Sequence, residues 1–392
     1  MTAMVVLIVG AGVGGLASAL LLARAGHSVR ILERASALAE AGGGLQISPN
    51  GMKVLAHCGL DAAVLERGFL PESIEMRHGR SGELQAQFEI KHTAPKRWGA
   101  SYVHIHRADL IDVLFNACSN HPNINIQMNT AVQTIESSEA RCTVIDEHSQ
   151  QYHADLLVGA DGIHSVVRQF MHGDDRPRYT GHTAWRACIA LADLKGPPPP
   201  PSACAWTGPG RHAVTTWLRG GQWVNFVGVV EDPQWKTESW RIKQPVDAAK
   251  AHFANWHPVI AGVLDSVDEL YRWGLYDRAP LSHWHQGSAV LLGDAAHPML
   301  PSAAQGAVQA LEDAFVLADA LAQFDDIGRA LVVYESRRKP RATRVQKTSR
   351  QNAAMFHRKN ALTQWLQFAP IKGISTFAPE LFYRRYDWLY GG

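Results

Sequence analysis

The sequence lacks long hydrophobic runs, paired cysteines and an excess of charge of either sign. No run reaches the roughly 18 apolar residues that a membrane span needs, so we expect no membrane segment. The five cysteines are odd in number and have no CxxC spacing, which predicts reduced thiols in a cytoplasmic protein and no metal site. Lys and Arg total 38 against 36 for Asp and Glu, and this balance argues against nucleic acid or an acidic membrane as a partner.

The most informative motif lies in the first 34 residues. The pattern predicts a buried strand at Val5–Val9, a glycine turn, an apolar helix from about Val13 to Ala25 and a second strand from about Ser28 to Leu32. This order is typical of a Rossmann-type nucleotide-binding unit. Because the apolar start has no basic segment and its glycines belong to the turn, we do not interpret it as a signal peptide.

The turn has the spacing Gly10-x-Gly12-x-x-Gly15. The first glycine permits the tight bend, the second lets the backbone approach a pyrophosphate, and the third lets helix and strand pack closely. Glu33 ends the second strand, where an acidic side chain accepts hydrogen bonds from a ribose. We therefore expect a dinucleotide here. The alternative is a glycine turn in an ordinary α/β unit.

Two later segments also combine a strand, a small-residue turn and a helix. The predicted strand Tyr152–Val158 leads into Asp161-Gly162. The predicted strand Ala289–Leu292 ends at Gly293-Asp294, before a helix from about Ala304 to Leu321. In open α/β folds ligands bind at the carboxyl edge of the sheet. We expect both aspartates at that edge.

The remaining segments predict a hairpin over Ile74–Ile90 and a helix over Ala108–Ser119. Arg107 precedes that helix, and a cation there opposes the helix dipole, so we expect a nearby anion. From about Asp175 to Leu281 the pattern is β-rich, and seven of the twelve tryptophans fall between Trp185 and Trp256. Large aromatics on strands are usually core, but they could also wall an apolar pocket.

The C-terminal part predicts helices. Ile327–Lys359 has the pattern of a long amphipathic helix rich in Arg and Lys, and an aromatic tail follows at 382–392. We interpret these segments as a packing arm and a solvated cationic face.

The glycine turn with Glu33-Arg34, the Asp161-Gly162 turn and Gly293-Asp294 stand in the order and spacing of the single-component flavoprotein aromatic hydroxylases, which the chain resembles. It is most similar to the salicylate and 6-hydroxynicotinate hydroxylase branch. The likeness covers essentially the whole length, including Tyr179–Ala187, Gly208–His212 and the terminal DWLYG. The resemblance implies an α/β fold, with a Rossmann-like FAD-binding domain, an interleaved β-rich substrate domain and C-terminal helices.

A chain of 392 residues is longer than a single hydrophobic core usually holds, so we expect more than one domain. The changes of sequence pattern along the chain predict where the domain boundaries lie. Residues 1–174 and 282–325 would form the two parts of the FAD-binding domain. Residues 175–281 would form the β-rich substrate-binding domain, and residues 326–392 the C-terminal helical arm.

The resemblance also implies how FAD is held. A helix N-terminus would face the pyrimidine side of the flavin, where it stabilises the negative charge of the reduced ring. Pro301 would lie beside the isoalloxazine and would be, with His212, a catalytic residue. The implied FAD-binding residues are Gly10, Gly12, Gly14, Gly15, Glu33 and Arg34 at the adenosine end, Arg107 and Asp161 along the middle, Asp294 on the ribityl chain, and Gly306 and Ala307 at the helix start.

The sequence has one complete nucleotide fingerprint and no redox cysteine pair. We therefore expect NADH or NADPH to dock transiently, reduce the flavin and leave. Reaction with O2 would give a flavin hydroperoxide, which must be kept from water until it meets its substrate. An electron-rich aromatic ring is the natural acceptor of the oxygen atom, and deprotonating a hydroxyl group on that ring makes the ring more nucleophilic.

His212 is the expected base, because the resemblance places a histidine there and imidazole titrates near neutral pH. The alternative is a hydrogen-bonded strand histidine. The chain departs from the family at other substrate positions, with Thr216 in place of a tyrosine and Ser302 in place of a histidine. Arg186 or Arg211 could meet a substrate carboxylate through charge-assisted hydrogen bonds.

Together these features predict a FAD-dependent, NAD(P)H-driven monooxygenase. Its substrate would be a small aromatic or N-heteroaromatic compound, hydroxybenzoate-like or hydroxypyridine-like, hydroxylated with or without loss of a carboxylate. Two alternatives stay open, a flavin oxidase or epoxidase on a non-aromatic substrate and a nucleotide-binding sensor without turnover. We expect a cytoplasmic monomer or homodimer whose partners are the aromatic substrate, NAD(P)H and O2.

Overall fold

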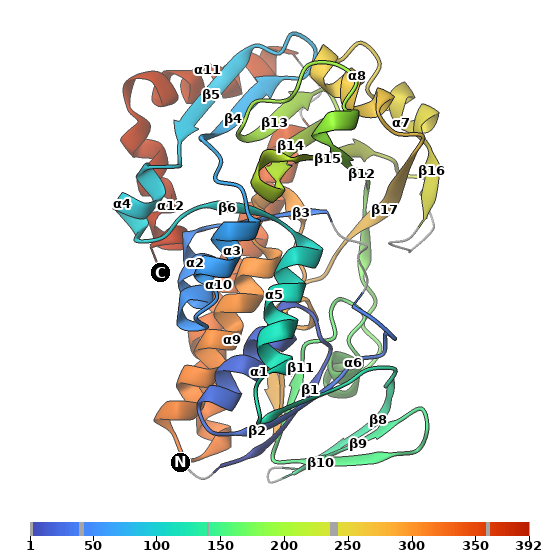
Figure 1. Cartoon of the computed structure of the whole chain (residues 1–392), viewed down its shortest axis with the longest axis vertical. Coiled ribbons are helices and arrows are strands. Elements are labelled where there is room, and N and C mark those ends of the chain that lie inside the picture. The colour runs from blue at the N-terminus through green and yellow to red at the C-terminus, as the bar shows by residue number, and fades with distance from the viewer. Residues whose placement is uncertain (1–2, 39–42, 139–140, 236–241, 358–360, 392) are drawn as a thin grey trace.

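The computed structural model describes residues 3–38, 43–138, 141–235, 242–357 and 361–391. Two sheets lie at opposite ends of the long axis, and the helices α9 and α10 run between them (Figure 1). The strands are β1 Val5–Val9, β2 Ser28–Leu32, β3 Gly44–Ile47, β4 Ser73–His78, β5 Leu84–Glu89, β6 Val103–His106, β7 Ile124–Gln127, β8 Val132–Ser137, β9 Cys142–Asp146, β10 Gln151–Ala154, β11 Leu156–Gly159, β12 Arg178–Ala190, β13 Ala203–Gly208, β14 Arg211–Leu218, β15 Trp223–Glu231, β16 Lys243–Pro245, β17 Glu269–Asp277, β18 His285–Gln286 and β19 Ala289–Leu291. The helices are α1 Val13–Arg24, α2 Pro49–His57, α3 Asp61–Arg67, α4 Thr93–Trp98, α5 Arg107–Ser119, α6 Val166–His172, α7 Val246–His252, α8 Pro258–Asp265, α9 Gly306–Gln323, α10 Ile327–Phe356, α11 Ala361–Phe377 and α12 Pro379–Tyr390.

A six-stranded sheet near the N-terminus has the order β18-β19-β11-β1-β2-β7. All of its pairs are parallel except β18 with β19. Val9 of β1 lies opposite Gly159 of β11, and Gly159 lies opposite Leu291 of β19. Three strands from distant parts of the chain therefore end level with one another, and the turns that follow them meet at one edge. The α/β fold class predicted from the sequence is confirmed.

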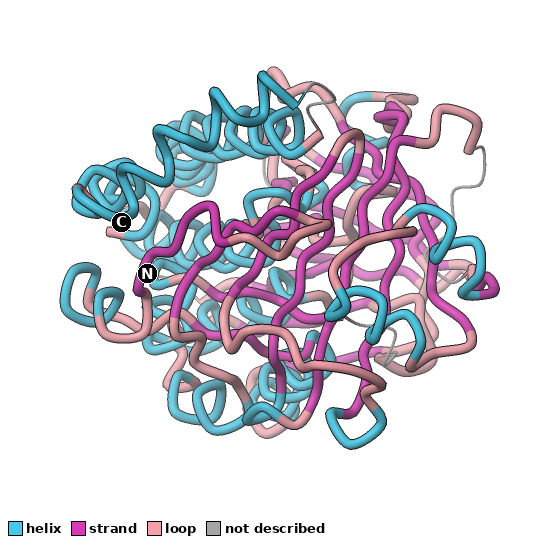
Figure 2. Tube along the Cα trace, turned by 90° about the horizontal axis from the view of Figure 1, so that it is seen from above, coloured by secondary structure: helices cyan, strands magenta, loops and turns pink. Residues whose placement is uncertain are grey.

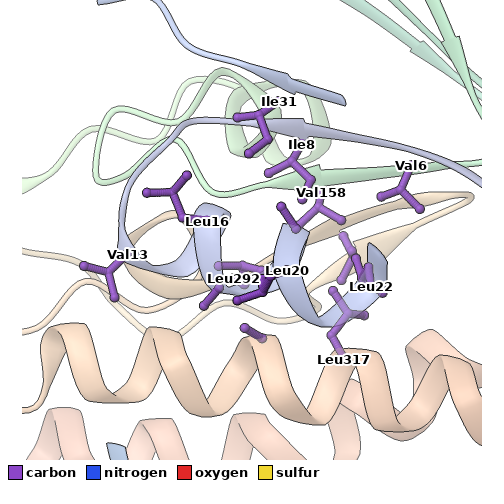
Figure 3. Packing of buried hydrophobic residues seen from close by; sticks show 14 of the residues in the cluster. Val6, Ile8, Val13, Leu16, Leu20, Leu22, Ile31, Val158, Leu292 and Leu317 are labelled. Atoms are coloured by element: carbon purple, nitrogen blue, oxygen red, sulfur yellow. The ribbon is translucent and has the colours of Figure 1, made fainter. Parts of the chain in front are cut away.

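Helix α1 is buried along almost its whole length, because it lies between this sheet and α9 (Figure 3). A helix that is apolar on all sides is stable only in such a position. A Cβ on Gly14 of α1 would lie 2.6 Å from Leu292 Cδ1 and 3.1 Å from Ala310 Cβ. The glycine thus permits close packing of the first βαβ unit on the segment that follows β19.

A larger sheet of eight strands has the order β16-β17-β12-β15-β14-β13-β4-β5. Its strands form one broad layer with helices around the margins (Figure 2). The predicted hairpin β4–β5 joins this sheet through parallel pairing of β4 with β13. Helices α7 and α8 cover one face, and Trp185, Trp206 and Phe226 are buried in the core beneath them. The opposite face is not covered by these two helices, and the part of the chain predicted to bind FAD and the C-terminal arm lie on that side.

The prediction of a single strand over Tyr152–Val158 is wrong. The segment divides at Asp155 into β10, which belongs to the three-stranded sheet β10-β9-β8, and β11, which belongs to the six-stranded sheet. Asp155 accepts a hydrogen bond from the Val5 N–H at 2.8 Å, so the break is held by the start of β1. The residues of β10 alternate between buried and exposed, whereas those of β11 are all buried. No turn residue separates the two strands, so the sequence pattern alone does not reveal the division.

The C-terminal arm begins with α10, confirmed as one long helix to Phe356; residue 359, its predicted end, lies outside the described residues. Helix α12 packs beside β5 and α4, where Tyr383, Leu389 and Tyr390 join a buried aromatic cluster with Phe88 and Trp98. The aromatic tail therefore packs against the rest of the molecule. In the described residues no helix combines the length and the apolar character that crossing a membrane would require.

Candidate active site

The glycine turn follows β1, and its glycines meet different demands. Gly10 has a φ of +101°, and a Cβ on Gly15 would lie 2.0 Å from the Gly10 carbonyl oxygen. Neither position accepts a side chain. A Cβ on Gly12 would meet nothing within 4 Å. The Gly12 backbone therefore borders open space that a ligand can enter, while Gly10 and Gly15 hold the turn together.

Glu33 is fixed beside that turn at the end of β2. Its two carboxylate oxygens accept hydrogen bonds from the N–H groups of Ala11 at 2.8 Å and Ala35 at 2.9 Å. Each oxygen keeps a further lone pair for a ribose hydroxyl. Arg34 is exposed next to it, and Arg107 is exposed at the first position of α5.

Asp161 lies directly against the glycine turn, since a Cβ on Gly10 would lie 2.6 Å from the Ala160 carbonyl oxygen. Its Oδ2 accepts a hydrogen bond from the Val166 N–H at 2.7 Å and so anchors the start of α6. Its Oδ1 is buried and has no hydrogen-bond partner among the described residues. Burial raises the pKa of this carboxyl, and the Ser165 hydroxyl and the backbone donors oppose that rise. An acceptor left in this state fits a ligand that brings a donor.

The turn after β19 is held by a buried carboxylate, Asp313 of α9. Asp313 Oδ2 accepts a hydrogen bond from the Gly293 N–H at 2.8 Å and lies 2.5 Å from His297 Nε2, while Oδ1 accepts one from Arg338 Nε at 2.7 Å. Burial alone would raise the pKa of Asp313, but His297 and Arg338 lower it to about 2. The charged network fixes the turn so that the exposed side chain of Asp294 faces a cavity.

The loop from Pro301 leads to the N-terminus of α9. Ala304 has a φ of +52°, which residues with a Cβ adopt rarely, and its N–H donates to the Pro301 carbonyl at 2.9 Å. The first N–H groups of a helix have no intrahelical acceptor. Those of Gly306 and Ala307 therefore face the cavity that both residues line, and they suit an anion or a carbonyl oxygen.

A cavity of about 380 Å³ lies between Asp294 with the loop that leads to α9, the uncovered face of the large sheet and the C-terminal arm. Such a volume suits a small ligand or the reactive end of a larger one. The predicted residues that it brings together are His212, Asp294, Pro301, Ser302, Gly306 and Ala307.

His212 reaches the cavity from β14 and is buried. Its Nδ1 lies 2.7 Å from Nε2 of His357 at the end of α10, and the Phe356 ring packs on it with 5.0 Å between centroids. Burial, and then the neighbouring His357 and His182, hold the pKa of His212 well below its usual value. The imidazole is therefore neutral near pH 7, and a neutral imidazole can accept a proton.

The other predicted substrate residues play different parts. The Ser302 hydroxyl donates to the Ser349 carbonyl at 2.6 Å and so ties the proline loop to α10. Thr216 is buried and accepts a hydrogen bond from Asn225 Nδ2 at 3.1 Å. Arg211 points to the opposite face of the sheet, because successive strand residues alternate. Its guanidinium donates to the His252 carbonyl at the end of α7, away from the cavity.

Arg186 of β12 lies opposite Val227, which lines the cavity, so the two side chains share one face of the sheet. Its guanidinium carbon lies 5.0 Å from the Trp273 ring centroid and 5.7 Å from that of Tyr271. A Cβ on Gly43 would lie 2.5 Å from Arg186 Cδ, so the chain at Gly43 runs directly over this side chain. Burial lowers the pKa of the guanidinium.

Most of the aromatic residues that line the cavity were not expected from the sequence. Of the tryptophans between 185 and 256 whose positions the structure describes, none lines the cavity, and the core alternative holds for Trp185, Trp206 and Trp256. The aromatic tail lines it instead, through residues whose i, i+4 spacing on a helix was the available signal. These residues are Phe382, Tyr386 and Tyr390, with Trp388 beside them. Asn225, which accepts a hydrogen bond from the Gly44 N–H at 2.9 Å, was also missed.

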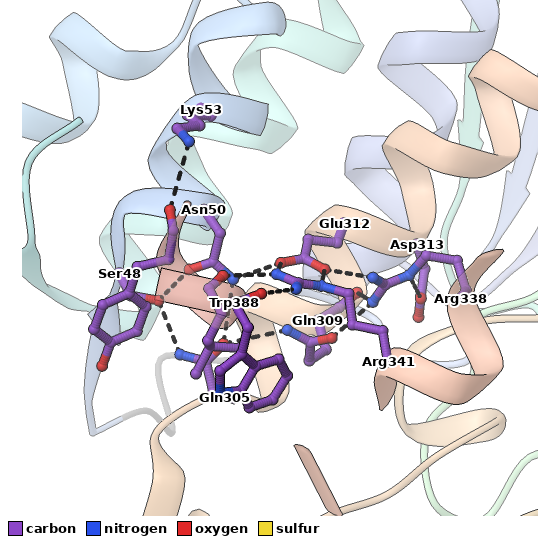
Figure 4. A network of polar contacts seen from close by, with 12 residues as sticks. Ser48, Asn50, Lys53, Gln305, Gln309, Glu312, Asp313, Arg338, Arg341 and Trp388 are labelled. Atoms are coloured by element: carbon purple, nitrogen blue, oxygen red, sulfur yellow. Dashed lines mark hydrogen bonds and ion pairs between the residues drawn. The ribbon is translucent and has the colours of Figure 1, made fainter. Parts of the chain in front are cut away.

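A buried polar network connects the arm to the start of α9 (Figure 4). Glu312 accepts hydrogen bonds from Asn50 Nδ2 at 2.5 Å and from Arg341 Nε at 2.6 Å, and it also pairs with Arg338. Arg341 donates in addition to the Leu389 carbonyl at 2.6 Å. The network therefore ties α2, α9, α10 and α12 together around the cavity.

These observations define a nucleotide-binding α/β protein with a partly aromatic cavity. A family model described as "FAD binding domain" matches residues 3–349. The 3-hydroxybenzoate 6-hydroxylase of Klebsiella oxytoca is 35% identical over 387 residues, covering 98% of this chain and 96% of that protein. The 6-hydroxynicotinate 3-monooxygenase of Pseudomonas fluorescens is 34% identical over 352 residues, covering 88% and 90%. The solved structure of Klebsiella pneumoniae HpxO with FAD and uric acid is similar at a TM-score of 0.84 and 25% identity, covering 94% and 93%.

The chain belongs to the FAD-binding domain family, and it is a flavoprotein monooxygenase. The predicted resemblance and the predicted cofactor are confirmed. The described residues fit FAD on their own evidence, through the open backbone at Gly12, the buried unpartnered Oδ1 of Asp161 and the helix N-terminus at Gly306.

Proposed function

We propose that this flavoprotein hydroxylates a small phenolic or hydroxypyridine acid, with NADH or NADPH as the electron donor. The observation that carries the proposal is the cavity in which the neutral imidazole of His212 shares one space with Pro301 and the N-terminus of α9. The names of two relatives, a 3-hydroxybenzoate 6-hydroxylase and a 6-hydroxynicotinate 3-monooxygenase, support this class of substrate.

Bound FAD supplies the redox chemistry, since it accepts a hydride from NAD(P)H and activates O2. The chain supplies the binding. The residues that would hold the cofactor are Gly10, Gly12, Gly14, Gly15, Glu33 and Arg34 at the adenosine end, Arg107 and Asp161 along the middle, Asp294 at the ribityl chain, and Gly306 and Ala307 at the pyrimidine end. The dipole of α9 would stabilise negative charge at that end.

His212 would act on the substrate hydroxyl. A phenolate ring is more nucleophilic than a phenol ring, and Nε2 of His212 is the atom that can take the proton. General-base assistance of this kind is typically worth roughly 100-fold to 10,000-fold. Thr216 and Ser302 would shape the site indirectly, Thr216 through Asn225 and Ser302 through its bond to α10.

The aromatic wall of α12 would exclude water from the site. Phe382, Tyr386 and Trp388 line the cavity on the side of the C-terminal arm. Removing water strengthens every electrostatic interaction in the cavity and protects reactive species from hydrolysis. The arm therefore has a task in catalysis and not only in packing.

The experiment is a screen of FAD-loaded protein with salicylate, 3-hydroxybenzoate, 4-hydroxybenzoate and 6-hydroxynicotinate. At least one acid should stimulate NAD(P)H oxidation and yield a product with one oxygen atom from labelled O2. Measurement of released CO2 decides whether a carboxylate is lost. If no acid stimulates oxidation, or if labelled oxygen reaches only hydrogen peroxide, the proposed function is wrong.

The domain boundaries, the monomer or homodimer state and the cytoplasmic location stay predictions. The five cysteines are free thiols, four of them buried, as reduced structural cysteines would be.

A further inference from the structure

Three histidines and a carboxylate meet where the end of α10 covers the large sheet. His182 of β12 lies opposite Glu231 of β15, and His212 of β14 lies opposite Val229, so all project from the face that lines the cavity. His357 lies over them, with its ring centroid 4.9 Å from that of His212 and 4.8 Å from that of His182.

Two hydrogen bonds in this cluster involve ring nitrogens of the histidines. His212 Nδ1 lies 2.7 Å from His357 Nε2. His182 Nδ1 lies 3.0 Å from the Thr180 carbonyl oxygen, which only accepts, so in the neutral ring Nδ1 carries the proton and Nε2 carries the lone pair. A nitrogen of His182, a nitrogen of His357 and an oxygen of Glu231 lie within 4.8 Å of one another. One water molecule can bridge a separation of that size.

The cluster also joins the buried cavity to the surface. His212 and His357 are buried, whereas His182 and Glu231 are partly exposed. In the described part of the chain these four are the titratable side chains that face one another here. A proton that remained on His212 would place a positive charge beside His357 and His182 in an apolar cavity, and that arrangement is unfavourable. A base in this position needs a route by which the proton leaves.

We propose that His357 is a positioning residue that relays the proton of the substrate hydroxyl from His212 to Glu231 and His182 at the surface. The inference rests on the proposed function, because it takes His212 as the base.

Each transfer balances. The substrate O–H bond breaks and its proton binds Nε2 of His212, while the Nδ1 proton of His212 passes to Nε2 of His357. The Nδ1 proton of His357 then passes to the Glu231 carboxylate or to Nε2 of His182, and from there to water. One proton leaves for each substrate bound, and no charge stays on the buried rings. The reverse transfer protonates the product as it departs and restores the starting tautomers.

The test follows proton release with a pH-indicator dye in a stopped-flow experiment, when the acid that activates the enzyme is mixed with FAD-loaded full-length protein without NAD(P)H. Wild type should release one proton per site. His357→Phe keeps a ring of similar size but removes both nitrogens, and we expect release to slow about tenfold or more. The kcat for hydroxylation should fall in parallel, with little change in KM and in the flavin spectrum.

A second variant separates proton relay from packing. In His357→Ala, added imidazole should restore both release and kcat, whereas pyrrole, which has the same shape but no basic nitrogen, should not. His153, exposed on β10 and paired with Thr143, provides the control. His153→Gln should release the proton at the wild-type rate.

The outcomes separate the two proposals. Wild-type rates of proton release in His357→Phe, or equal rescue by imidazole and pyrrole, would overturn the relay while the proposed function stands. A wild type that no acid of the screen activates overturns the proposed function and the relay with it. If His357→Phe loses FAD, the double variant His182→Gln with Glu231→Gln, at partly exposed positions, must slow release, and normal release there rejects the relay.

Discussion

The three glycines of the first turn carry different constraints although they share one motif. Gly15 packs against the Gly10 carbonyl oxygen, whereas Gly12 borders open space. The motif alone does not distinguish a glycine that the turn geometry requires from a glycine that leaves space for a ligand. The backbone around Gly10 and Gly15 leaves no room for a side chain, whereas Gly12 leaves space that a ligand can enter.

We expect Gly12→Ala to leave the thermal stability of the FAD-free protein within about 1 °C of wild type, because its methyl group meets no protein atom. Its affinity for FAD should fall, since the methyl group occupies the approach to the turn. Gly15→Ala should lower the melting temperature of the FAD-free protein, because the new Cβ would clash with backbone. Calorimetry and FAD titration measure both effects, and equal melting temperatures would contradict the assignment.

His212 offers a test of its role as a base. We expect His212→Gln to retain FAD, as judged by the flavin absorbance, and to lower the hydroxylation rate roughly 100-fold or more. Thr215→Ser, at a buried position on the other face of β14, serves as a control with normal hydroxylation. A His212→Gln enzyme with the wild-type rate would show that the substrate ionises without this residue.

The lowered pKa of His212 also predicts a dependence of stability on pH. In the unfolded chain this imidazole takes up a proton near pH 6.5, and in the folded protein it does so only well below that pH. The unfolded state therefore binds more protons, and stability falls as the pH drops below about 6.5. His212→Gln should lose less thermal stability than wild type between pH 7 and pH 5, which melting curves at several pH values measure.

At the scale of single elements, α9 positions the site by means of charges buried in its first half. Asp313 holds the turn of Gly293 and is itself held by His297 and Arg338. Removing one partner from a buried ion pair leaves the others without compensation. The turn that presents Asp294 to the cavity therefore depends on a residue that does not line it.

Asp313→Asn should destabilise the protein by about 3–5 kcal/mol and lower the melting temperature by about 5 °C or more. Asp319→Asn, partly exposed on the same helix and paired with Arg337, is the matched control and should cost at most about 1 kcal/mol. Since the pKa of Asp313 is about 2 in the fold and 3.8 in the reference state, its contribution is present above pH 4 or so and is lost as the pH falls toward 2. Similar melting curves for both variants would argue against this role.

At the scale of the whole molecule, the cavity is built from segments at both ends of the chain. Asp294 and the loop over 299–307, which follow β19, provide one wall, and the turns after β1 and β11 meet the β19 turn at the edge of the parallel sheet. The opposite wall comes from β14 and β15, and α12 provides the aromatic side. Arg97 of α4 fastens that helix through a bidentate pair with Asp387.

Removing one aromatic ring from α12 should weaken substrate binding more than cofactor binding. Burying an aromatic side chain is worth about 1.5–3 kcal/mol, so Tyr386→Ala should raise the KM for the aromatic acid roughly tenfold or more while FAD absorbance stays unchanged. Arg385→Ala changes the exposed neighbour on the same helix and should leave KM as in wild type. An unchanged KM in Tyr386→Ala would remove α12 from the substrate site.

The elements with local signals were predictable from the sequence. The βαβ unit, the turns at Asp161 and Asp294 and the long helix α10 follow from glycine spacing and apolar periodicity, which depend on neighbouring residues alone. The position of His212 followed from a family resemblance. The domain pattern placed β4 and β5 in the first 174 residues without indicating that they extend the sheet of the second domain.

What only the tertiary structure decided depends on contacts between residues far apart in sequence. His357 contacts His212 although 145 positions separate them in the sequence. Arg211 points away from the cavity, and residues of the aromatic tail line it. A strand pattern states that His212 and Arg211 face opposite sides, but only packing decides which side is the site. The sequence by itself determined the first βαβ unit, its glycine turn and a dinucleotide as the ligand, because those are local properties, whereas the substrate pocket exists only after separate segments have packed together.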